Sequence, residues 1–162
     1  MHSLRQRLNV RDESAFTLIE LLVVLIIIGV LLAIAIPSYL GFQKSAQQTA
    51  AASDVRSAIP DVEEYYQDNN ETYAGTPAMT AAYLKSQYDN GLSVSNAGST
   101  GIVTVKASTA ADTTVTPNIP AGQEYCVSAV DAGNFAHVAG PGGVVRTKET
   151  TDACAAWTSG PS

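Results

Sequence analysis

The sequence predicts an α+β fold in which a long, hydrophobic N-terminal α-helix packs against a small antiparallel β-sheet. An apolar segment near the N-terminus continues into a segment whose apolar residues recur at helical spacing. Short runs rich in β-branched and aromatic residues follow, separated by Gly, Pro, Asp and Asn. A chain of 162 residues has room for one globular domain besides this helix.

Charge is unevenly distributed along the chain. There are 9 basic and 15 acidic residues, a net charge of −6. Arg5, Arg7 and Arg11 precede Phe16, as do two acidic residues, which leaves 6 basic and 13 acidic residues from Phe16 onward. Nucleic-acid affinity comes largely from Lys and Arg that displace counterions, so this acidic portion predicts no direct nucleic-acid binding.

The segment from Phe16 to Ile36 contains 21 residues with a single charge, Glu20. As an α-helix it is about 31 Å long, which is enough to span a bilayer. The arginines in front of it predict, by the positive-inside rule, that the N-terminus stays in the cytoplasm. Everything after Pro37 is then expected outside the cytoplasm.

Two other interpretations of this segment remain open. The basic start, the apolar run and Ala33-Ile34-Ala35 together resemble a conventional secretory signal peptide, whose removal leaves a secreted binding domain or enzyme. A plain membrane anchor, neither cleaved nor assembled, is the other alternative. The length of the apolar run, and a charge at Glu20 that serves no purpose in a discarded peptide, favour a retained helix.

Glu20 needs a compensating partner. An ionisable residue in a membrane segment costs roughly 2.5 to 3.5 kcal/mol at the helix centre and is usually retained for a function. If the leader is cut between Ala15 and Phe16, the new α-amino group lies about 6 Å before Glu20 along the helix axis and is positively charged near neutral pH. The two groups can pair within one chain or between neighbours.

Residues Ser14 to Leu22, SAFTLIELL, resemble the processing and methylation motif of type IV prepilins and of the pseudopilins of type II secretion, and the resemblance extends over roughly Arg11 to Val55. It implies a pilin-like fold, cleavage before Phe16 by a membrane aspartyl peptidase, and N-methylation of Phe16. It also implies that Glu20 pairs with a neighbouring subunit's amine during assembly. The family normally has Gly before the cut; Ala15 stands there in this chain and bears on the rate of processing.

Pro37 lacks an N–H and clashes with the carbonyl four residues back, so we expect the helix to be kinked or locally unwound around Ala33. The alternative is that Pro37 only marks the exit from the membrane. Gly29 and Ala33 form a small-xxx-small pair that permits close approach of helices, although chance is an alternative in a run so rich in Ala and Gly.

The second half of the helix is predicted to be amphipathic and to end at Asp68-Asn69-Asn70, with a second weak point at Pro60. The whole helix then runs from about Phe16 to Gln67. The acidic cluster is expected to point mostly to solvent: Asp61, Glu63 and Glu64. The residues expected on the apolar face are Ala51, Val55, Ala58, Ile59, Val62 and Tyr66.

The rest of the chain is predicted to contain a short helix within Ala78–Tyr88 and five strands. The predicted strands are Ile102–Lys106, Thr113–Thr116, Glu124–Val130, Phe135–Ala139 and Gly143–Thr147. Cys126 and Cys154 are the only cysteines, and the resemblance implies a disulfide between them that pins the C-terminal segment to the sheet. Closing a loop of about 29 residues stabilises by roughly 3 to 4 kcal/mol. Two unpaired structural cysteines are the alternative.

No pattern in the sequence predicts a catalytic, metal or cofactor site. His2 lies in the leader and His137 in a predicted strand, so no His pair is available for a metal or a Cys-His dyad. The segment from Gly140 to Gly143 is a turn that no Lys-Ser or Lys-Thr helix follows, hence no phosphate-binding loop. Asn70, in an Asn-x-Thr sequence, is either a glycosylation acceptor or part of a helix-ending loop.

We therefore expect a structural subunit that is held in the inner membrane as a single-pass precursor and then assembled into an extracellular filament for adhesion or motility. The resemblance implies its partners: identical subunits, the prepilin peptidase, an assembly ATPase and an inner-membrane platform protein. The alternative is a pseudopilin of a type II secretion or DNA-uptake machine. The expected parts of the chain are a leader (1–15), a membrane and filament-core half-helix (16–37), an amphipathic half-helix (38–69), a connecting region (70–101) and the sheet with its disulfide-tied end (102–162).

Overall fold

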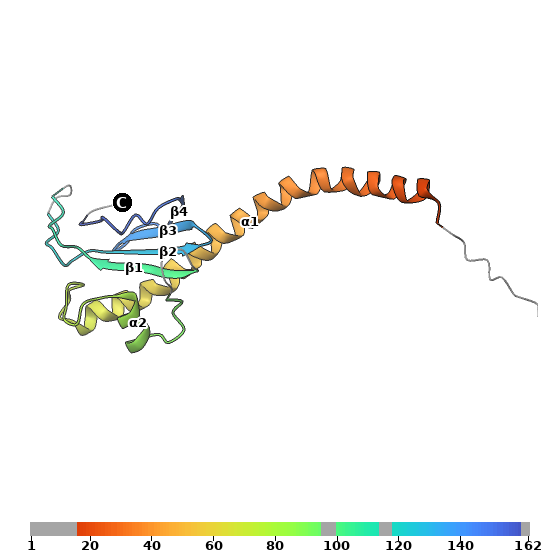
Figure 1. Cartoon of the computed structure of the whole chain (residues 1–162). Coiled ribbons are helices and arrows are strands. Elements are labelled where there is room, and N and C mark those ends of the chain that lie inside the picture. The colour runs from red at the N-terminus through yellow and green to blue at the C-terminus, as the bar shows by residue number, and fades with distance from the viewer. Residues whose placement is uncertain (1–15, 95–99, 114–117, 160–162) are drawn as a thin grey trace, which may run out of the picture. The chain divides into compact units, whose positions relative to one another are not determined.

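The computed structural model describes residues 16–94, 100–113 and 118–159. The strands form one antiparallel sheet in the order β1-β2-β3-β4, which Figure 1 shows beside α2 and the yellow part of α1. This arrangement confirms the predicted α+β fold class. The chain divides into two compact units, Met1–Gly41 and Phe42–Ser162. The elements are α1 (Leu18–Asp68), α2 (Ala81–Gln87), β1 (Gly101–Ala107), β2 (Tyr125–Asp131), β3 (Asn134–Gly140) and β4 (Arg146–Glu149).

α1 passes through both of its prolines without ending. The backbone around Ala33 is helical, so the local unwinding considered for that position is not observed. Because Pro37 has no N–H, the Ala33 carbonyl receives no bond from it. One residue later the Ser38 hydroxyl donates to the Ile34 carbonyl at 3.4 Å, a contact of the kind that often bends helices. The kink at Pro37 stays a prediction.

The C-terminal half of α1 buries a wide face. Its buried residues are Ala51, Ala52, Val55, Ala58, Asp61, Val62 and Tyr65. One prediction for this face was wrong: Asp61 is 7% exposed instead of facing solvent. Tyr66 packs against the core but is only partly buried, while Tyr65, which was not predicted on this face, is fully buried. The reason is that apolar side chains of the sheet and of α2, such as Val127 and Leu84, share one core with this helix.

β2 and β3 form a tight hairpin at the centre of the sheet. Asp131 pairs with Asn134 across the two-residue turn Ala132-Gly133, and both turn residues have positive φ, 45° and 81°. This is the type I′ geometry that matches the twist of antiparallel strands, and it explains the glycine at the second turn position. The predicted strands that correspond to β1, β2 and β3 are confirmed to within one residue at each end.

Two strand predictions have other outcomes. The strand predicted at Gly143–Thr147 was wrong in position, since β4 is Arg146–Glu149. The preceding Pro141 lacks a donor and Gly142 has a φ of 80°, so pairing with β3 resumes only where Arg146 faces His137. The strand predicted at Thr113–Thr116 lies largely outside the described residues; beside it, Asp112 and Ile119 form an isolated antiparallel bridge.

Tyrosine side chains attach the region between α1 and β1 to the core. The Tyr65 hydroxyl donates to the Pro77 carbonyl at 2.7 Å, and the Tyr73 hydroxyl donates to a Glu63 carboxylate oxygen at 2.9 Å. Thr80 caps α2, because its hydroxyl accepts a bond from the Tyr83 N–H at 3.2 Å. α2 lies inside the predicted range 78–88.

The C-terminal segment is fastened to the sheet at Cys154 by a disulfide to Cys126 on β2. Asp152 adds a second attachment. Its carboxylate accepts a bond from the buried Ser128 hydroxyl at 2.5 Å, another from the Thr104 hydroxyl, and a third from the Cys154 N–H at 3.0 Å. The disulfide and the Asp152 carboxylate therefore both attach this segment to the sheet.

Candidate assembly segment at the N-terminus of the helix

All side chains from Phe16 to Ala46 are exposed, although most of them up to Ile36 are apolar. Leu18, for example, is 88% exposed and Ile19 is 70% exposed. Within the described residues, α1 is the one helix long and apolar enough to cross a membrane, by length and composition. Apolar surface on this scale marks a contact with membrane or protein. It fits a membrane-anchored precursor.

Thr17 and Glu20 form a capping box at the start of α1. The Glu20 N–H donates to the Thr17 hydroxyl at 3.3 Å, and the Glu20 carboxylate accepts from the Thr17 N–H, also at 3.3 Å. Each side chain thus satisfies a backbone donor that the first helical turn leaves free. The spacing Thr-x-x-Glu is the sequence signal for this motif, and our sequence analysis did not use it.

The capping box gives Glu20 a structural role beside the predicted assembly role. Two groups of Thr17 donate to its carboxylate at 3.3 Å: the backbone N–H and the side-chain hydroxyl. Phe16 is 77% exposed, and Ala15 lies outside the described residues, as does the whole predicted leader. The cleavage site, the methylation of Phe16 and the pairing of Glu20 therefore remain predictions.

The other predicted site residues lie away from this segment. Asn70 is exposed immediately after α1 and has a φ of 58°, a left-handed conformation typical of helix ends, and its glycosylation remains a prediction. His137 is 3% exposed, and no described residue forms a hydrogen bond with either of its ring nitrogens. Among the described residues, no three His, Cys, Asp or Glu side chains lie close enough to hold a metal ion.

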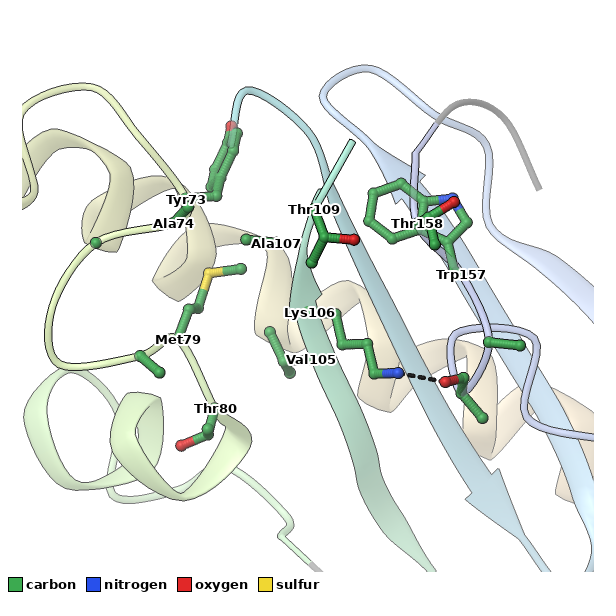
Figure 2. A pocket seen from close by; sticks show the side chains of 14 residues that line it. Tyr73, Ala74, Met79, Thr80, Val105, Lys106, Ala107, Thr109, Trp157 and Thr158 are labelled. Atoms are coloured by element: carbon green, nitrogen blue, oxygen red, sulfur yellow. Dashed lines mark hydrogen bonds between the residues drawn. The ribbon is translucent and has the colours of Figure 1, made fainter. Parts of the chain in front are cut away.

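A groove of about 730 Å³ lies beside β1, between the loop at residues 73–80 and the C-terminal segment. Figure 2 shows Met79 and Val105 on one side of it and Trp157 on the other. Its charged side chain, Lys106, donates to the Ala155 carbonyl across the groove. Among the described residues, the lining contains no carboxylate or imidazole.

Comparison with known proteins shows which family of proteins shares the N-terminal segment of this chain. Residues 10–36 match the family model described as the prokaryotic N-terminal methylation motif. The resemblance of Ser14–Leu22 to prepilins is thereby confirmed: the chain carries the motif of the family that includes type IV pilins and type II secretion pseudopilins.

The relatives come from both branches of that family. The chain is 38% identical over 93 residues to the fimbrial protein EcpC of Eikenella corrodens, and the aligned region covers 57% of this chain and 61% of EcpC. It is 38% identical over 76 residues to the type IV wide pilus major component PilA4 of Thermus thermophilus, covering 47% and 58%. It is 37% identical over 60 residues to the type II secretion system core protein G of Aeromonas hydrophila, covering 37% and 42%. The chain thus spans less than two thirds of each, and no solved structure is significantly similar to it.

Proposed function

We propose that this chain is a prepilin, cut between Ala15 and Phe16, that assembles into an extracellular type IV pilus serving adhesion or motility. The observation that carries the proposal is the exposed apolar half of α1 with the carboxylate of Glu20 one turn from Phe16. In the membrane, lipid covers this surface. In a filament, identical copies cover it, and packing that does not close into a ring extends as a helical fibre.

The same surface explains why assembly needs a machine. Moving some 20 apolar residues from the bilayer into a fibre requires a route that never exposes them to water. We propose that the partners are a prepilin peptidase, a cytoplasmic assembly ATPase and an inner-membrane platform protein, with the precursor held in the inner membrane beforehand. Cleavage frees the amine of Phe16, which is then methylated and pairs with Glu20 of a neighbouring copy.

Substitutions at Glu20 separate its charge from its capping role. Glu20→Gln keeps an oxygen that accepts from the Thr17 N–H but removes the charge, while Glu20→Ala removes both. We expect both variants to insert and to be cleaved normally, and both to lose most of the fibre that electron microscopy finds in sheared surface material. Thr17→Ala is the matched control, because it weakens the cap and keeps the charge, so it should still assemble. Normal fibre yield from Glu20→Gln would refute the charge-pairing role.

Sequencing the N-terminus of the mature protein from its native host tests the processing step. We expect N-methylated Phe16 as the first residue. A chain beginning at Ile36 would instead indicate conventional signal-peptide cleavage after Ala35, and the filament proposal would fall with the lost helix.

A pseudopilin of a type II secretion or DNA-uptake machine is the second candidate. It is favoured by the similarity to the type II secretion core protein G, which lies within the same family. Long surface fibres that contain this chain support the pilus. Their absence at normal expression, together with loss of an exported protein or of DNA uptake on deletion of the gene, supports the pseudopilin.

A further inference from the structure

Charge is segregated on the unit that begins at Phe42. Basic side chains gather where the amphipathic half of α1 lies beside β4; we call Arg56 and Lys148 the basic patch. Acidic side chains gather at the end of α1 and the end of α2; we call Asp61, Glu64, Asp68 and Asp89 the acidic patch.

The basic patch lines a hollow of about 300 Å³, and apart from Ala52 the residues that line it have polar or charged side chains. Arg56 and Lys148 enter it from α1 and β4, and hydroxyl and amide groups of Thr49, Thr147 and Gln48 line it between them. Arg56 and Lys148 are both exposed, and no described residue forms an ion pair with either. Two free cations with hydroxyl and amide donors around them suit a carboxylate.

The acidic patch is not neutralised within the described part of the chain. Asp61 is 7% exposed, and its Oδ2 atom is buried with no hydrogen-bond partner. Burial, with the carboxylates of Asp89 and Glu64, raises the pKa of Asp61. Lys85 is the basic residue of α2, and its ammonium group donates to the Leu92 carbonyl at 2.7 Å. Glu64, Asp68 and Asp89 are exposed around the buried Asp61, so a cation can approach from solvent.

We propose that the basic patch of one subunit binds the acidic patch of the next, so that Arg56 and Lys148 face Glu64 and Asp68 of a second copy of this chain. This proposal rests on the proposed filament. Because the two patches are different surfaces, the contact is heterologous and repeats from copy to copy instead of closing a twofold dimer.

The position of the patches on α1 sets the direction of the contact. Arg56 precedes Glu64 by 8 residues and Asp68 by 12, which is about 12 to 18 Å along a helix axis. A neighbour displaced along α1 by about this length, with its helix parallel, brings the carboxylates level with Arg56. Burial between subunits excludes salt, so these pairs are screened less than exposed surface ion pairs are, and the desolvation of the charges offsets part of that gain.

Charge exchange between the patches tests the contact in fibres from the native host. Arg56→Glu alone places like charges opposite each other, and so does Glu64→Arg alone; we expect each to lower the yield of sheared fibre about tenfold at an unchanged level of cleaved subunit. The double variant Arg56→Glu with Glu64→Arg should recover the yield, because the pair is restored with reversed sign.

The matched control is Arg56→Glu with Glu71→Arg, which restores the same net charge at a position outside the acidic patch. The Glu71 N–H donates to the Tyr66 carbonyl, and the Glu71 carbonyl accepts a hydrogen bond from the Gln123 side-chain amide. Glu71 therefore lies beside Tyr66 and Gln123. This control should stay deficient. Equal rescue by both double variants, or full yield from Arg56→Glu alone, overturns the contact. Absence of fibres from the unmodified chain instead overturns the proposed pilus, so the two failures are distinguishable.

Discussion

At the scale of single residues, two carboxylates of α1 are held in opposite ways. Glu20 is exposed, and backbone and hydroxyl groups of Thr17 donate to it. Asp61 is almost fully buried, and one of its oxygens receives no hydrogen bond from the part of the chain that the structure describes. An unsatisfied buried oxygen costs about 1 to 3 kcal/mol, so Asp61 reduces the stability of the unit that contains it. Such a cost is consistent with a residue retained for a partner.

Asp61→Asn is expected to raise the free energy of unfolding at pH 7 by about 1 kcal/mol, since it removes a buried charge. The pKa of Asp61 is raised above its ordinary value of 3.8, mainly by burial. Between 3.8 and the raised pKa the folded state holds the proton more tightly than the unfolded state, so stability falls as the pH rises through this window. The increase in the free energy of unfolding on Asp61→Asn is therefore complete above the raised pKa of Asp61 and disappears below pH 3.8.

Urea unfolding of the full chain in detergent, followed by circular dichroism at pH 7 and at pH 3.5, measures this difference. Glu71→Gln is the control, because that carboxylate is exposed and its removal should change stability by less than about 0.5 kcal/mol. A loss of stability at pH 7 in Asp61→Asn would show that the carboxylate has a favourable partner in the folded chain.

At the scale of elements, the C-terminal segment depends on attachments more than on regular structure. It contains no helix or strand within residues 150–159, and it is held at Cys154 and Asp152. The strand it crosses, β2, is buried along almost its whole length, because the helix covers one face and this segment lies over the other. The attachments therefore keep water away from the centre of the sheet.

Replacing both cysteines, Cys126→Ala with Cys154→Ala, is expected to lower the free energy of unfolding by roughly 3 to 4 kcal/mol, because the unfolded chain regains the freedom of a loop of about 29 residues. Denaturant unfolding measures the change, and hydrogen exchange should show faster exchange in residues 150–159. Reduction of the unmodified chain with dithiothreitol is the control and should give the same loss. Unchanged stability after both treatments would mean that the bond is not formed in the protein.

At the scale of the whole molecule, the two units have different relations to solvent. The buried apolar residues of the described chain begin at Ala51, within the unit that starts at Phe42. The helix before it exposes its apolar side chains throughout. One unit therefore has a core of its own, and the other depends on a membrane or on neighbouring copies for cover.

A fragment that begins at Phe42 is therefore expected to fold as a soluble monomer with its disulfide formed, and to be unable to form fibres. Cooperative thermal unfolding and a monomeric mass in solution would support this. The control is the same fragment with Val55→Asp, which places a charge at a fully buried position and should prevent folding. An aggregated or non-cooperative fragment would show that residues before Phe42 are needed for the core.

The sequence by itself determined the features that depend on local order along the chain. The apolar run, the motif around Phe16 and Glu20, the end of α1 near Asp68 and the three strands β1 to β3 follow from periodicity, side-chain type and turn residues, which act between neighbours. The capping box of Thr17 and Glu20 was readable in the same way.

Only the tertiary structure decided which surfaces meet. The burial of Asp61 depends on α2 and the sheet sharing one face of α1, and the attachment of Asp152 to Ser128 and Thr104 joins residues far apart in sequence. The start of β4 at Arg146 follows from its register with His137. Each of these is a contact between distant segments, whose position is set by how the core packs and not by the residues on either side.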